Sequence, residues 1–210
     1  DSNVVAMTYY DSAYRRIVNG SLVNVCDGSV IAFLAGLVYR KRLEAFPGPV
    51  IFQSYVENPT YNQLVIGNSE VTWLKMVNKL RSKGISTDYL RWLDVPFCDV
   101  DDFDFIRIAD QVNKMNPDII WVSLGAPKQE VFMSRLLPYL NRGIMLGIGA
   151  AVNFYVGDIG IPKMHIGALN FVWACRVLHE PTKQIKRLIR VFGAYPVLLY
   201  EEFEKARRIA

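Results

Sequence analysis

The sequence has few cysteines, and they lie far apart. Cys26, Cys98 and Cys175 are the three in 210 residues, and no two of them form a Cys-x-x-Cys pair. Such a set supplies neither the ligands of a zinc site nor the framework of a disulfide-stabilised domain, and it is typical of a reducing compartment. We therefore expect no bound metal.

Long hydrophobic runs and a strong charge of one sign are also missing. No apolar run reaches the ~20 residues that a membrane span needs, and no signal-peptide pattern is visible. The formal net charge of +4 is too small to indicate nucleic acid as a partner. Because 51% of the residues are apolar, the chain is expected to be globular, without a membrane span and without nucleic acid.

Several well-known nucleotide and nucleophile motifs are absent as well. There is no Gly-x-x-x-x-Gly-Lys-Ser/Thr sequence, which excludes a P-loop NTPase, and no Gly-x-Ser-x-Gly nucleophile elbow. Gly147 and Gly149 form a glycine pair late in the chain, but the third glycine of a dinucleotide fingerprint is missing. An NAD(P)-dependent oxidoreductase is therefore a weaker alternative, which titration with NAD(P)H would test.

The chain does contain alternating strand and helix patterns. Their order predicts an α/β fold, a doubly wound, mostly parallel sheet with helices on both faces and a C-terminal amphipathic helical appendage. The expected strands are residues 21–25, 63–66, 119–124 and 143–148, with 3–8 as a further strand or the remnant of one. The expected helices are residues 11–18, 30–39, 71–83, 105–115, 131–140 and 182–192, and residues 45–49 are expected to form a loop.

Residues 118–130 form the most informative stretch. An apolar run at 119–124 is followed by Gly125, Ala126, Pro127 and then Lys128, Gln129 and Glu130. Glycine ends a strand and proline suits the first turn of a helix, so three polar side chains follow the carboxyl end of a strand. Ligands of open α/β sheets bind at that edge. On pattern alone, an ordinary strand-to-helix connection with a solvated first turn is an equal alternative.

Two other turns carry candidate groups. Asp27 is expected between a strand and the helix at 30–39, where it is either a helix N-cap or a general base open to a ligand crevice. Gly67, Asn68 and Ser69 follow the strand at 63–66 and offer backbone N–H groups at a helix start, which suits a phosphate. The same three residues are equally consistent with a tight turn.

The helix at 182–192 is strongly amphipathic. Four cations occupy one face and four apolar residues another. A solvated face over a packed apolar face is one interpretation; a contact with an anionic membrane surface or a diphosphate is the other. The basic residues are Lys183, Lys186, Arg187 and Arg190, and the apolar residues are Ile185, Leu188, Ile189 and Phe192.

These motifs together resemble the WecG/TagA/CpsF family of bacterial glycosyltransferases. Residues 125–130 are similar to the family signature Gly-Ser/Ala-Pro-Lys-Gln-Glu, and Asp27 with Gly28 to its Asp-Gly pair. Residues 65–67 are similar to its strand ending in glycine, and residues 147–150 to its Gly-Ile/Val-Gly turn. Arg176, followed by Glu-Pro at 180–181, matches a further motif, so the resemblance covers residues 3 to 190.

The resemblance implies transfer of a sugar from a UDP-sugar to a polyprenyl-diphosphate-linked sugar in cell-wall or surface polysaccharide biosynthesis. The transfer would be inverting and metal-independent, with no cofactor beyond the donor substrate. The transferred sugar would be N-acetylmannosamine, its uronic acid or a related hexose. Residues 1–178 would form the glycosyltransferase domain. Residues 179–210 would form an appendage that docks on the inner face of the cell membrane and helps complete the active site, with a homo-oligomer as a further expected partner state.

The resemblance also assigns roles to individual residues. Asp27 would be the catalytic base, and Lys183, Lys186, Arg187 and Arg190 would contact the membrane or the acceptor. The substrate-binding positions carried over are Thr8, Gly28, Gly67, Asn68, Gly125, Lys128, Gln129, Glu130, Gly149, Asn153 and Arg176.

Some positions depart from the family pattern. Asn153 stands where the family usually has aspartate, Ala45 where it has arginine, and the Thr-x-Asn motif is poorly kept around Thr8. These departures leave the donor sugar open. They also leave a second function class, a non-catalytic relative that binds a nucleotide sugar or a partner transferase.

Overall fold

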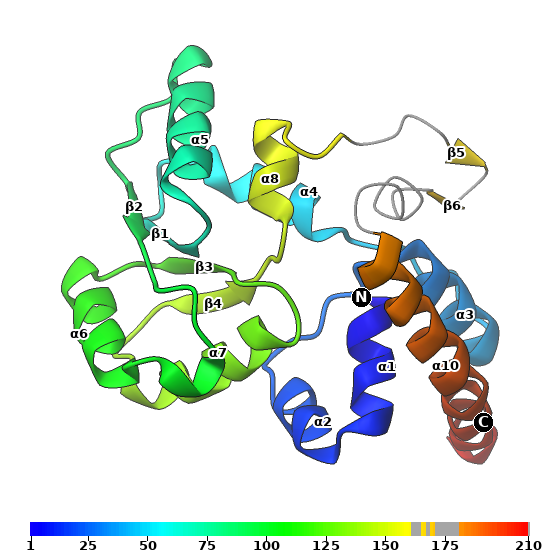
Figure 1. Cartoon of the computed structure of the whole chain (residues 1–210). Helices are drawn as coiled ribbons and strands as arrows, with labels where there is room; N and C mark the ends of the chain where they lie inside the picture. Colours follow the sequence, from blue (N-terminus) through cyan, green and yellow to red (C-terminus); the bar gives the residue numbers. More distant parts are fainter. Residues whose placement is uncertain (161–164, 167–168, 171–180, 210) are drawn as a thin grey trace. The chain divides into compact units, whose positions relative to one another are not determined.

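The computed structural model describes residues 1–160, 165–166, 169–170 and 181–209. Contacts divide the chain into two compact units, whose elements Figure 1 labels. We call Gly48–Ile159 the sheet unit, and Asp1–Pro47 together with Gly160–Ala210 the helical unit. The expected functional division into residues 1–178 and 179–210 stays a prediction.

The sheet unit is built on four parallel strands in the order β2-β1-β3-β4. The strands are β1 (Gln63–Gly67), β2 (Leu90–Leu93), β3 (Ile119–Ser123) and β4 (Ile144–Gly147). The two central strands pair from Gln63 opposite Ile119 to Gly67 opposite Ser123, so their carboxyl ends are level. Every residue of β1 is buried, as expected for a parallel strand covered on both faces.

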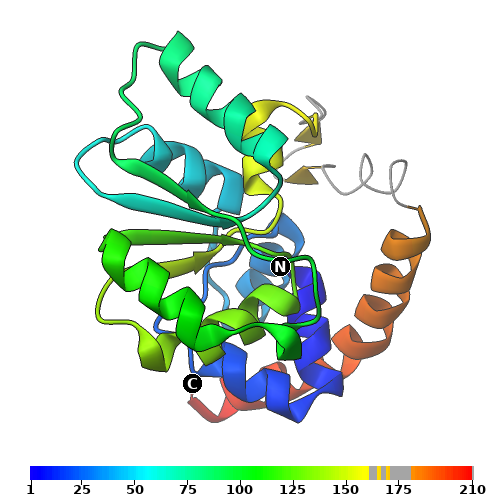
Figure 2. The ribbon, with the colours of Figure 1, turned by 60° about the vertical axis from the view of Figure 1, so that its left-hand side comes forward.

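Helices cover both faces of this sheet, which lies between two helical layers in Figure 2. Against one face, α4, α5 and α8 enclose a core in which the rings of Phe52 and Trp121 meet edge to face, 5.2 Å between centroids. Against the other, α6 and α7 enclose a core that includes Phe132. The helices are α4 (Gly48–Val56), α5 (Glu70–Ser82), α6 (Phe105–Met115), α7 (Lys128–Leu136) and α8 (Ala151–Val156), with 3-10 turns η1 (Val100–Asp102) and η2 (Leu137–Tyr139).

The predicted α/β class is therefore confirmed, although β2, α4 and α8 of the sheet unit were not expected. The strands expected at 63–66, 119–124 and 143–148 are β1, β3 and β4. The sequence did not reveal β2, because a four-residue strand at the sheet edge is too short for a clear hydrophobic pattern. The loop expected at 45–49 gives way to α4 at Gly48, since Pro49 lies in the first turn, where a missing N–H costs no hydrogen bond.

The helical unit consists mainly of helices that pack around the C-terminal one. α10 lies along α1 and also contacts α3 (Figure 1). The Tyr39 hydroxyl on α3 donates a hydrogen bond to Glu202 Oε2 on α10 at 2.6 Å. The elements are α1 (Ser2–Tyr10), α2 (Ser12–Asn19), α3 (Ser29–Tyr39), α10 (Pro181–Ile209) and the short antiparallel pair β5 (His165–Ile166) and β6 (Leu169–Asn170).

Two strands expected in the N-terminal region are wrong. Residues 3–8 lie in α1, where the Asp1 carboxylate accepts from the N–H of Val4 at 2.8 Å and the buried residues follow a helical spacing. Residues 21–25 are exposed and pair with no strand in the part of the chain that the structure describes. Apolar residues such as Leu22, which is 91% exposed, form a strand only where a neighbouring strand completes their backbone hydrogen bonds.

Candidate active site

Three turns follow the carboxyl ends of β1, β3 and β4 along one edge of the sheet. The backbone has positive φ at Gly67 (89°), Asn68 (65°), Gly125 (74°) and Gly149 (50°). A Cβ at Gly67 would lie 2.9 Å from the backbone oxygen of Ser123, so the turns after β1 and β3 approach too closely for a side chain. The strand register thus brings turns that are far apart in sequence to one place, where α/β sheets hold their ligands.

A chain of hydrogen bonds joins these turns. Asn68 Nδ2 donates to Ser123 Oγ at 2.7 Å, and Ser123 Oγ donates to the backbone oxygen of Gly149. Ser123 is the last residue of β3 and was not selected by the sequence reasoning. Its signal was a single hydroxyl at the end of an otherwise apolar strand, two residues before the motif that begins at Gly125.

The Gln129 side chain holds the turn after β4 in place by a hydrogen bond. The side chain is only 6% exposed; Oε1 accepts from the N–H of Gly149 at 2.9 Å, and Nε2 donates to Glu130 Oε1 at 2.8 Å. Gly147 makes room for this contact, because a Cβ there would lie 2.9 Å from Gln129 Nε2. The amide therefore has a structural role in fixing α7 to the end of β4.

The two carboxylate oxygens of Glu130 differ in their hydrogen bonding. Oε1 accepts from Gln129, whereas Oε2 is buried and has no hydrogen-bond partner among the described residues. A buried carboxylate oxygen without a partner is costly unless something else donates to it. The site therefore offers a hydrogen-bond acceptor beside the strand-end turns.

Lys128 turns toward the loop after β2. Its Nζ donates to the backbone oxygen of Cys98 and lies 4.8 Å from the centroid of the Phe103 ring. The same ammonium is 5.5 Å from the ring of Phe97, which is fully exposed. Lys128 thus fixes this loop to the start of α7, while its neighbour Gln129 contacts the turn after β4 and also binds Glu130.

Asn153 is the third residue of α8, shortly after the turn at Gly149. It is half-buried, and its backbone oxygen accepts from the N–H of Asp158 at 3.0 Å. Of the substrate-binding positions expected from sequence, the sheet unit therefore brings Gly67, Asn68, Gly125, Gln129, Glu130 and Gly149 together, with Asn153 nearby in the chain.

Four of the expected catalytic and substrate-binding residues belong to the helical unit, namely Thr8, Asp27, Gly28 and Arg176. Asp27 is exposed and lies one position before Gly28, which is the N-cap residue of α3. The expectation that Asp27 follows a strand is wrong, because 21–25 is not a strand, and so is its interpretation as the N-cap residue itself. Thr8 lies on α1, and its hydroxyl donates to the backbone oxygen of Val5 at 2.7 Å. Arg176 lies outside the described residues.

The predicted amphipathic helix is part of α10, but its faces are used differently from the expectation. Arg190 does not point away from the core: it is half-buried, and its Nη1 donates to Asn3 Oδ1 on α1 at 2.9 Å. Lys186 is exposed and Arg187 half-buried, whereas the side chain of Lys183 lies outside the described part. The apolar residues form a partly exposed stripe on α10, and Ile185, Leu188, Ile189 and Phe192 are exposed by 51, 36, 67 and 74%.

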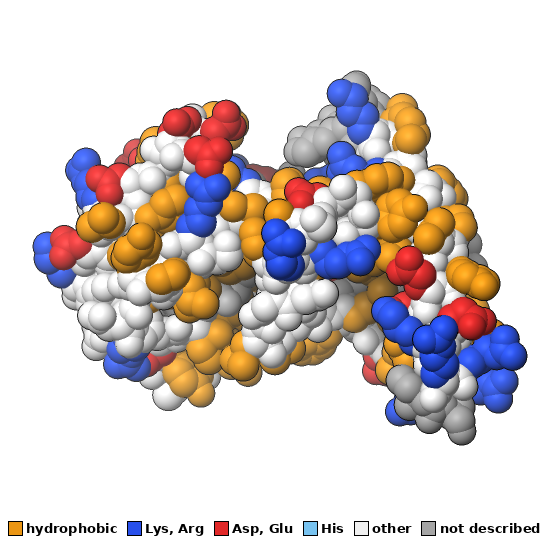
Figure 3. Space-filling model, turned by 90° about the horizontal axis from the view of Figure 1, so that it is seen from below, with side chains coloured by type: hydrophobic (Ala, Val, Ile, Leu, Met, Phe, Trp, Pro, Cys, Tyr) orange, Lys and Arg blue, Asp and Glu red, His pale blue; other side chains and the backbone are white. Residues whose placement is uncertain are grey.

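Figure 3 shows apolar side chains on the surface, interspersed with acidic and basic ones. Within the described ranges, no helix is long and apolar enough to cross a membrane. No group of three or more His, Cys, Asp or Glu side chains in those ranges is arranged to hold a metal ion.

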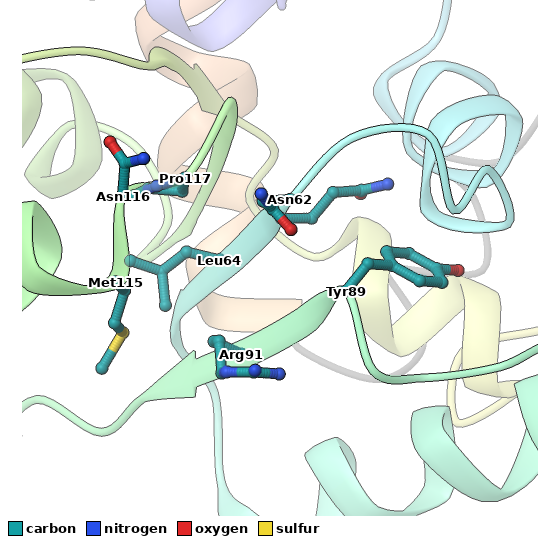
Figure 4. A pocket seen from close by; sticks show the side chains of 8 residues that line it. Asn62, Leu64, Tyr89, Arg91, Met115, Asn116 and Pro117 are labelled. Carbon is teal, nitrogen blue, oxygen red and sulfur yellow. The ribbon is translucent and has the colours of Figure 1, made fainter.

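The sheet unit also has a pocket at the opposite, amino-terminal edge of the sheet. It has a volume of about 150 Å³ and lies where β1 and β2 begin, before the start of β3. Figure 4 shows Asn62, Tyr89, Arg91 and Asn116 among its lining side chains. None of the catalytic or binding residues predicted from sequence lines this pocket, which is separate from the strand-end turns.

The fold and the strand-end turns define an α/β protein with a ligand edge at the carboxyl ends of a parallel sheet. The sequence model of the glycosyl transferase WecG/TagA/CpsF family matches residues 1–208, and the chain belongs to this family. It is thus a glycosyltransferase, as the resemblance of its motifs indicated.

Two similar proteins have names that describe an activity. A protein of Bacillus subtilis is 22% identical over 198 residues, which cover 93% of this chain and 75% of that protein. A protein of Staphylococcus aureus (strain MRSA252) is 20% identical over 200 residues, which cover 94% of this chain and 75% of that protein. Both are named N-acetylglucosaminyldiphosphoundecaprenol N-acetyl-beta-D-mannosaminyltransferase.

Proposed function

We propose that this protein transfers N-acetylmannosamine or a related hexose from a UDP-sugar to a polyprenyl-diphosphate-linked sugar during the synthesis of a cell-wall polymer. The observation that carries the proposal is the activity named for the two relatives, each of which aligns with more than nine-tenths of the chain. The strand-end turns support it, because they place the polar side chain of Asn68 and the buried oxygen of Glu130 at the edge where α/β sheets bind ligands.

In the proposed reaction, the acceptor hydroxyl oxygen attacks the anomeric carbon as its bond to UDP breaks. The hydroxyl proton passes to the carboxylate of Asp27, and the bonding electron pair leaves with the diphosphate. A single attack from the face opposite the leaving group inverts the anomeric centre. Asp27 is exposed at the start of α3, which suits a base that must accept a proton from a substrate.

We propose that the UDP-sugar binds at the strand-end turns of the sheet unit. The spare oxygen of Glu130 accepts a hydrogen bond from the donor, and Gln129 holds the turn at Gly149 in place for it. The leaving diphosphate is stabilised by cations instead of a metal. Arg176 is the proposed principal cation, with Lys183 and Lys186 in support.

The acceptor requires the protein to work at a membrane surface. We propose a peripheral position on the inner face of the cell membrane, with α10 as the contact. The exposed apolar stripe that includes Ile189 and Phe192 enters the headgroup boundary, and Lys186 adds an attraction to anionic lipid. A homo-oligomer remains a prediction without a described interface.

A panel of UDP-sugars with a lipid-diphosphate-linked N-acetylglucosamine acceptor tests the proposal, with the product identified by mass. We expect one hexose, N-acetylmannosamine first, to be added with release of UDP. The competing function is a nucleotide-sugar-binding relative without turnover, which Asn153 in place of the usual aspartate favours. Binding of UDP-sugar without product for any donor would support that relative and refute the transferase.

A further inference from the structure

The hydrogen-bond chain across the strand-end turns fixes the orientation of the Asn68 side chain. The backbone oxygen of Gly149 can only accept a hydrogen bond, so the Ser123 hydroxyl must direct its one proton there. Ser123 Oγ can then only accept from Asn68, which therefore turns its Nδ2 toward Ser123, at 2.7 Å. The other end of the carboxamide, Oδ1, faces away from Ser123 as a result.

The Asn68 Oδ1 atom is left as an unpaired acceptor at the ligand edge. It has no hydrogen-bond partner among the described residues, and the side chain is half-buried in the turn after β1. The backbone of Asn68 is left-handed, with φ of 65°, a conformation that glycine would adopt more readily. Asparagine is among the non-glycine residues that tolerate this conformation best, and unlike glycine it brings an amide to the turn.

We infer that Asn68 offers its carboxamide oxygen to a hydroxyl or N–H group of the nucleoside part of the donor, and that Ser123 is the positioning residue that fixes this orientation. A carbonyl oxygen carries partial negative charge and attracts hydrogen-bond donors, whereas it repels the oxygens of a diphosphate. The side chain of Asn68 therefore does not contact the diphosphate, whereas a phosphate contact through the backbone N–H groups of this turn stays a separate prediction. This inference rests on the proposed nucleotide-sugar donor.

The test measures binding of two probes, UDP and inorganic pyrophosphate, to the full chain by calorimetry. The variants are Ser123→Ala, Asn68→Gly and the double variant, because glycine keeps the left-handed backbone. We expect each single variant to weaken UDP binding about 3- to 10-fold, the range for one hydrogen bond, and to leave pyrophosphate binding unchanged. Since Ser123 acts through Asn68, the double variant should lose no more than Asn68→Gly alone.

Asn116→Gly is the matched control. Asn116 has the same left-handed backbone, with φ of 48°, but lies before β3 at the amino-terminal edge of the sheet. It should bind both probes as the unaltered protein does, and thermal unfolding of each variant shows whether the fold is kept.

Four outcomes would overturn the inference: unchanged UDP binding, equal losses for both probes, additive losses in the double variant, or a UDP loss of similar size in Asn116→Gly. Failure of the proposed function looks different. In that case the unaltered protein itself would not bind UDP, before any variant is compared.

Discussion

The α10 stripe leads to a quantitative prediction about membrane attachment. Ile185, Leu188, Ile189 and Phe192 are exposed by fractions that together amount to about two whole side chains. Burying one such side chain contributes roughly 1.5–3 kcal/mol, so complete immersion of the stripe would contribute about 3–6 kcal/mol. Lys186, an exposed cation beside the stripe, adds about 1 kcal/mol near an anionic surface. The apolar contribution should therefore dominate.

Vesicle sedimentation measures the apolar and the electrostatic contributions to membrane binding separately. Replacing Ile189 and Phe192 by serine removes the two most exposed members of the stripe, and should lower partitioning into vesicles by about 2–4 kcal/mol, or roughly 30- to 1000-fold. Lys186→Gln should lower partitioning only about 5-fold, and only with anionic lipid. The matched control is Ile106→Ser, because Ile106 is 70% exposed on α6 of the sheet unit and should have no effect.

The reasoning would be refuted by the opposite pattern. If salt releases the protein completely, while the double serine variant binds like the unaltered protein, attachment is electrostatic and the stripe has no part in it. An effect of Ile106→Ser as large as that of the stripe would show that any exposed apolar residue suffices.

Three further predictions concern the site and the stability of the sheet unit. Asp27→Asn should lower turnover ~10²–10⁴-fold with UDP affinity nearly unchanged, measured by steady-state kinetics and calorimetry; wild-type turnover would remove Asp27 from catalysis. Gln129→Ala should weaken donor binding or transfer by about 1–3 kcal/mol and also lower the melting temperature, because a braced backbone N–H loses its acceptor; unchanged kinetics and melting would contradict this. Burial raises the pKa of Glu57, but hydrogen bonds from Lys83 and Tyr155 outweigh it, so its pKa lies below the usual value. A depressed pKa contributes stability above the unfolded-state value and loses it as the pH falls through the folded-state value. Urea unfolding should therefore show Glu57→Gln less stable than the unaltered protein at pH 7, by up to about 1 kcal/mol since the pair is partly exposed, and this difference should shrink as the pH falls through the folded-state pKa; a difference that does not change with pH would contradict the assignment.

The candidate site was only partly predictable. Gln129 and Glu130 could be selected because their motif follows an apolar run that ends in glycine. Ser123 could not, since a strand-end hydroxyl has meaning only when strands from distant parts of the chain place Asn68 and Gly149 beside it. Gln129 was expected to face the donor, but its burial and both hydrogen bonds give it a bracing role that no sequence pattern contains.

The sequence by itself determined the features that depend on local chemistry. The strands β1, β3 and β4 rest on apolar runs, and the glycine turns that follow them rest on the backbone freedom of glycine. The family motif lies in the same local stretches, so it too was visible in the sequence.

Only the tertiary structure decided the features that depend on distant partners. Residues 21–25 carry strand-forming side chains but find no neighbouring strand, whereas the short β2 is a strand because β1 pairs with it. Periodicity placed Arg190 and Ile189 on different faces of one helix, but it could not decide which face another helix covers. α1 covers the side of α10 that includes Arg190, and this contact leaves the apolar side exposed.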